Sequence, residues 1–161
     1  MADVRKSPAA KNVLSALAVA IGGFILLNVV FLLDFLFQSA LRMITRLFRR
    51  GPPEMEGPGF GPPVNHILFL VLIGLISWLV YRSRLNVLLK AVYTVVPVAV
   101  VLTTLGIVLN NWPALIYILG VLFVAAVLIY LYIKKQHWLY FFAVTLTAAA
   151  LAVFTLAGGE I

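Results

Sequence analysis

Long apolar runs alternate with short polar breaks along almost the entire chain. The apolar runs cover residues 12–33, 64–81, 85–109, 114–133 and 138–157. Each run has about 18 residues or more, which is the length that an α-helix needs to cross the hydrocarbon core of a bilayer. We therefore expect an all-α integral membrane protein with five transmembrane helices.

The first apolar run is followed by an amphipathic segment. Polar residues recur there at a spacing that places them on one side of a helix. They are Asp34, Gln38, Arg42, Arg46, Arg49 and Arg50. Apolar residues such as Leu33, Phe37, Leu41 and Ile44 occupy the other side. The sequence thus predicts that the first span continues as an interfacial helix whose four arginines bind anionic lipid headgroups.

The polar breaks divide the chain into three parts. Residues 1–50 hold a basic N-terminus, the first span and its amphipathic extension. Residues 51–63 contain five prolines and four glycines, a composition typical of a linker without a core of its own. Residues 64–161 hold four spans joined by turns of about three or four residues. Because such short turns join neighbouring antiparallel helices, we expect these four spans to form an up-down bundle. The first span is free to pack elsewhere, including on another subunit.

The basic residues predict how the chain is oriented. With a cytoplasmic N-terminus, eight lysines and arginines lie on the inner side: Arg5, Lys6, Lys11, Arg82, Arg84, Lys90, Lys134 and Lys135. Only the four arginines of the amphipathic segment lie outside. Since cytoplasmic loops carry an excess of positive charge, we expect the N-terminus inside and the C-terminus outside, in the plasma membrane of a prokaryote. The alternative is a re-entrant first segment bent at Gly22 and Gly23, which gives a weaker asymmetry of seven against five.

Composition narrows the functional classes. Hydrophobic residues make up 64% of the chain and charged residues only 11%, whereas about a quarter of a soluble domain is charged. The net charge of +7 comes from residues between the apolar runs, a placement that favours lipid headgroups and not nucleic acid. The absence of cysteine excludes disulfides, thiolate metal sites and cysteine nucleophiles.

Three polar residues near the ends of the first two spans are candidate functional groups: Asp34, Gln38 and His66. A carboxylate at the centre of a span costs about 2.5–3.5 kcal/mol and is functional by default, although Asp34 also fits the membrane interface. His66 opens the second span on the same side, so the two form the minimum acid–base pair. No nucleophile or metal-binding spacing accompanies them, and His137 belongs to the opposite side. We expect no enzyme activity, metal or cofactor.

These observations predict a non-enzymatic membrane protein. The leading expectation is an integral subunit or accessory protein that acts through helix packing and anionic-lipid contact, in a membrane-protein complex or as a homo-oligomer. The alternative is a homo-oligomeric channel or transporter whose path is lined by Asp34 and intramembrane threonines. A subunit should present a dry interface of small residues. A transporter should show Asp34, Thr103 or Thr147 facing a cavity.

Overall fold

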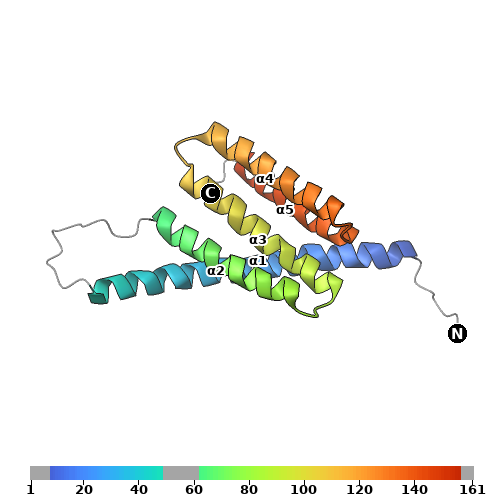
Figure 1. Cartoon of the computed structure of the whole chain (residues 1–161), viewed down its shortest axis with the longest axis horizontal. Coiled ribbons are helices and arrows are strands. Elements are labelled where there is room, and N and C mark those ends of the chain that lie inside the picture. The colour runs from blue at the N-terminus through green and yellow to red at the C-terminus, as the bar shows by residue number, and fades with distance from the viewer. Residues whose placement is uncertain (1–7, 49–61, 157–161) are drawn as a thin grey trace.

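The computed structural model of the chain describes residues 8–48 and 62–156 (Figure 1). Five helices make up this part of the chain: α1 (Pro8–Phe48), α2 (Pro62–Arg82), α3 (Val87–Val108), α4 (Pro113–Ile133) and α5 (Trp138–Leu156). All five are long and apolar enough to cross a membrane, and the described residues contain no strand. The prediction of an all-α membrane protein with five spans is therefore confirmed.

The helix ends follow from local chemistry. Both α2 and α4 begin with a proline, because the amide hydrogen that proline lacks would have no partner in the first turn. The C-terminus of α4 is closed by two hydrogen bonds, from the amide of Gln136 to the carbonyl of Leu131 and from Lys135 to Tyr132. Lys135 adopts the left-handed conformation, with φ of 50°. This is a Schellman closure in which a lysine takes the position that glycine usually occupies, and it reverses the chain into α5.

Helix α3 is the centre of the structure. It packs against each of the other four helices, and α1 is among its principal partners. Helix α1 lies between α2 and α5, which are not neighbours of each other. The predicted bundle of the last four spans therefore includes the first span as well. The small residues Gly22 and Gly23 pack against Val92 and Val95 of α3.

Two apolar clusters hold the helices together. The larger one joins the N-terminal half of α1, the start of α3, the end of α4 and the start of α5, through Val19, Ala91, Leu131 and Leu139. We call this end of the molecule the basic end, because Lys11, the last residue of α2 (Arg82) and the turns that carry Arg84, Lys134 and Lys135 lie there. The second cluster joins α1, α2 and α3 through Val30, Phe69, Ile73, Val96 and Val100.

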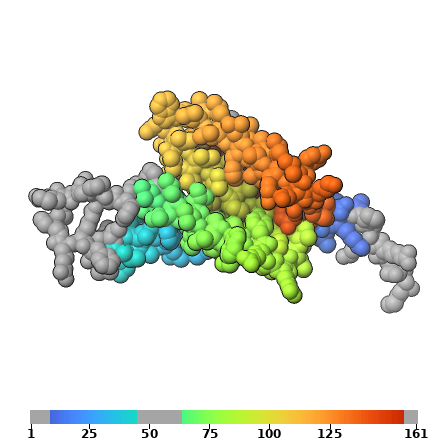
Figure 2. All heavy atoms as spheres, in the orientation of Figure 1, coloured from blue at the N-terminus to red at the C-terminus, as the bar shows by residue number. Residues whose placement is uncertain are grey.

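Helix α1 is much longer than a bilayer requires. Its 41 residues correspond to about 61 Å, whereas the hydrocarbon core is about 30 Å thick and the whole bilayer about 40–45 Å. It crosses the other helices obliquely (Figure 1), and its N-terminal end projects beyond them (Figure 2). The helix is continuous through Gly22 and Gly23, so the bend that the re-entrant alternative requires is absent.

Candidate functional site

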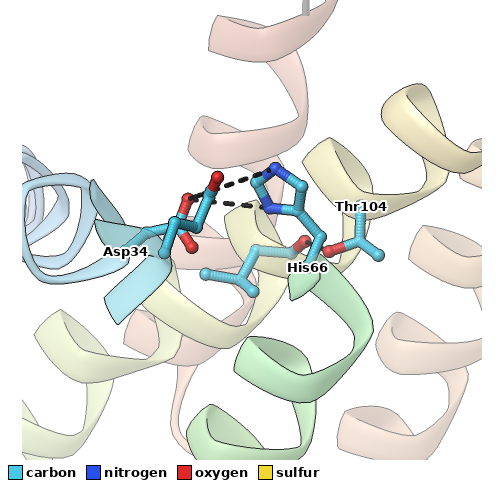
Figure 3. A network of polar contacts seen from close by, with 5 residues as sticks. Asp34, His66 and Thr104 are labelled. Carbon is cyan, nitrogen blue, oxygen red and sulfur yellow. Dashed lines mark hydrogen bonds and ion pairs between the residues drawn. The ribbon is translucent and has the colours of Figure 1, made fainter. Parts of the chain in front are cut away.

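Asp34, Gln38 and His66 meet where the second half of α1 packs against the start of α2, and Figure 3 shows Asp34 and His66 turned towards each other. The Gln38 amide nitrogen donates a hydrogen bond of 2.8 Å to Asp34 Oδ2. The same nitrogen lies 3.2 Å from His66 Nε2. His66 Nδ1 lies 3.6 Å from Asp34 Oδ2, which closes a triangle of polar contacts between the two helices. We call these three residues the polar triad.

The donors and acceptors of the polar triad are mutually consistent. The amide of Gln38 has two hydrogens, so one can go to Asp34 and the other to His66 Nε2. The ring nitrogen that accepts carries no hydrogen, so the hydrogen of a neutral imidazole is on Nδ1 and points towards the carboxylate. The side chains of His66 and Asp34 are only 17% and 15% exposed. The triad thus pairs Gln38 Nε2, Asp34 Oδ2 and His66 Nε2 with one another at the contact between the two helices.

One oxygen of the triad has no partner. Among the described residues, Asp34 Oδ1 is buried without a hydrogen bond, and so is the hydroxyl of Thr103 on α3. Thr104, labelled in Figure 3, donates its own hydroxyl to the carbonyl of Val100 at 2.7 Å. No third His, Cys, Asp or Glu joins Asp34 and His66 in the described part of the chain to form a metal-binding group. The triad has the chemistry of a polar helix–helix contact.

The first polar residues of the amphipathic segment are covered by another helix of the protein. Asp34 and Gln38 face α2, and Phe37 packs beside them with its ring centroid 5.7 Å from that of Phe69. Leu33 and Ile44 of the predicted apolar side are about half exposed. Arg42 is exposed, the side chain of Arg46 is not described, and Arg49 and Arg50 lie outside the described residues. The contact with α2 therefore removes the first polar residues from the hydrocarbon.

A second set of polar contacts, which the sequence analysis did not identify, joins α2 and α3 towards the basic end. The hydroxyls of Ser77 and Tyr93 are 3.1 Å apart, and those of Tyr81 and Thr94 are 3.0 Å apart. Lys90 Nζ donates a hydrogen bond of 2.9 Å to the carbonyl of Tyr81. Its positive charge thereby compensates the partial negative charge at the C-terminus of α2. The sequence does contain a signal for these contacts, because polar residues occur on both of the antiparallel helices that the short turn joins.

Among the apolar grooves on the surface of the described residues are a larger and a smaller one. The larger, of about 530 Å³, lies between α3, α4 and α5 and is lined by small and aliphatic residues, including Gly120, Ala148, Ala149 and Ala152. The smaller, of about 400 Å³, lies between α1 and the α2–α3 hairpin. Asp34, Thr103 and Thr147 line neither groove. The candidate polar residues therefore lie outside both of these grooves.

No protein family, curated protein or solved structure matches this chain. The five apolar helices establish the membrane as its environment. Its function is inferred from its own residues alone.

Proposed function

We propose that the protein is a non-enzymatic integral subunit or assembly protein of a membrane complex, which acts through helix packing and lipid contact. The observation that carries the proposal is the larger apolar groove between α3, α4 and α5. Its wall combines Gly120 with the alanines at 148, 149 and 152. Small residues let another helix backbone approach closely, and close approach supplies the van der Waals contact that drives association in lipid.

The dimensions of the groove favour a helical partner. Along α4 it extends from Ile116 to Leu128, which corresponds to about 18 Å, or more than half of the hydrocarbon thickness. The hydroxyl of Thr155 at one end already donates to the carbonyls of Leu151 and Ala152. Helix α4 has a single buried residue, Leu131. It therefore offers nearly its whole length to a neighbour.

The channel or transporter alternative has weaker support. In its favour are the two buried oxygens without partners, on Asp34 and Thr103. Against it, the hydroxyls of Thr104 and Thr147 donate to the carbonyls of Val100 and Ala143 in their own helices. A polar path needs groups that face a cavity, and neither groove contains Asp34 or Thr103.

The proposed lipid contacts and orientation follow from charge. We place the arginines at 42, 46, 49 and 50 among anionic headgroups, where each cation contributes about 1 kcal/mol. We place the basic end on the cytoplasmic side, because the larger group of lysines and arginines gathers there. This orientation puts the polar triad near the outer surface of a plasma membrane.

A groove-filling substitution tests the proposed function. Ala152→Trp fills the larger groove, whereas the neighbouring Val153, which is 66% exposed and outside the groove, provides the control Val153→Trp. Tagged full-length protein is purified from native membrane after cross-linking. We expect a partner in fixed stoichiometry with the wild type and the control, and at least fivefold less with Ala152→Trp. Absence of such a partner, or equal recovery with both variants, would overturn the proposal. Recovery of only the chain itself would identify a homo-oligomer.

A further inference from the structure

The smaller groove runs from the basic end into the membrane-spanning part of the molecule. Its wall consists of side chains from three helices and one turn: Gly22, Ile25, Leu26, Val29, Val80, Leu85, Leu89, Val92 and Tyr93. On α1 it extends from Gly22 to Val29, which corresponds to about 10 Å. That length lies within one leaflet, because half of the hydrocarbon core is about 15 Å thick. The groove therefore fits part of an acyl chain better than a helix that crosses the membrane.

The mouth of the groove is positively charged. Leu85 of the lining is preceded by Arg84, which is exposed in the α2–α3 turn. The only acidic residue in the described part of the chain is Asp34, in the polar triad at the other end of α2. The mouth thus complements an anion.

The other two cations of this hairpin already have partners within the protein. The Arg82 guanidinium lies over the Trp78 ring, 5.2 Å from its centroid. Lys90 Nζ donates to the carbonyl of Tyr81. Arg84 is therefore the cation of the hairpin that is assigned to a ligand at the mouth.

We propose that this groove is a binding site for an anionic phospholipid. The phosphate lies at Arg84, and one acyl chain lies along Ile25, Leu89 and Val92. Apolar contact holds the acyl chain, and the cation at Arg84 selects an anionic headgroup. This site lies at the opposite end of the bundle from the arginines of the amphipathic segment. It is independent of the partner helix proposed above, because it lies in the other groove and requires no protein partner.

Native mass spectrometry of the purified full-length chain tests the site. The protein in detergent is titrated with phosphatidylglycerol or with phosphatidylcholine of the same acyl chains, and bound lipid is counted by mass. We expect phosphatidylglycerol to bind at least fivefold more tightly. Arg84→Gln should weaken its binding about fivefold, which corresponds to one cation near an anionic surface. The control Lys134→Gln removes a cation at the same end but outside the groove, and it should change binding less than twofold.

A second pair of variants tests the acyl-chain position. Ile25 is exposed within the groove and Ile21 is equally exposed outside it, so Ile25→Trp should lower the binding of both lipids while the control Ile21→Trp has no effect. Equal losses in Arg84→Gln and Lys134→Gln would show general surface attraction and overturn the site. Unchanged binding in Ile25→Trp would overturn the groove as the acyl-chain position. If Ile25→Trp instead released a co-purifying protein, the groove would be a protein contact, which also overturns the proposal.

Discussion

The contact between α1 and α3 at Gly23 makes a sharp prediction about stability. A β-carbon added at Gly23 would lie 2.7 Å from Val95 Cγ2 and 3.3 Å from Val95 Cβ. Val95 is buried, and a valine in a helix has one strongly preferred rotamer, so its methyl group has nowhere to move. Gly23→Ala should therefore push α1 away from α3.

The magnitude follows from a comparison with Gly74, where an added β-carbon would meet nothing within 4 Å. Alanine is favoured over glycine within a helix by about 0.8–1.0 kcal/mol, and this gain is common to both positions. Overpacking of a core costs about 1–3 kcal/mol and applies only at Gly23. Gly23→Ala should thus be about 1–3 kcal/mol less stable than Gly74→Ala.

The free energy of unfolding is measured by titrating protein in mild detergent with a denaturing detergent and following circular dichroism. A double-mutant cycle isolates the contact: in a Val95→Ala background the cost of Gly23→Ala should largely disappear, because the blocking methyl groups are gone. If Gly23→Ala and Gly74→Ala behave alike in the wild-type background, the close approach of α1 to α3 is refuted.

Two further predictions concern the polar triad and the membrane orientation. Gln38→Leu removes the donor to Asp34 and leaves the carboxylate poorly paired, so the free energy of unfolding should fall by about 1–3 kcal/mol. The control Ser39→Ala, which alters an exposed hydroxyl bonded to its own helix, should change it by less than about 0.5 kcal/mol; equal effects would mean that the triad contacts do not form. Single cysteines placed by Ser83→Cys and Gly59→Cys should be labelled from opposite sides of intact cells, and labelling from the same side would contradict a five-span topology.

The number and extent of the helices could be predicted from the sequence. The fourth apolar run, residues 114–133, became a helix over Pro113–Ile133, and the second, residues 64–81, became one over Pro62–Arg82. The reason is that a bilayer has a set thickness and offers no water to satisfy a free backbone amide or carbonyl. Apolar length alone therefore predicts a span, and proline or charged residues predict its ends.

The candidate site could be predicted only in part. The direction of successive spans placed Asp34 and His66 on the same side of the membrane. Contact between them depends on the rotation of α1 and α2 about their axes, which decides whether His66 reaches Gln38. The contact of Lys90 with the carbonyl of Tyr81 likewise depends on how α3 returns against α2.

The arrangement of the helices was decided by the tertiary structure. The sequence left α1 free to pack elsewhere, yet its glycines lie against Val92 and Val95 at the centre of the protein. The mostly exposed α4 and the central α3 are both apolar along most of their length. In water an apolar face marks the side of a helix that becomes buried, but in a bilayer the lipid is as apolar as the protein core. Which faces meet is then decided by shape and by a few polar contacts, and these depend on how the helices pack.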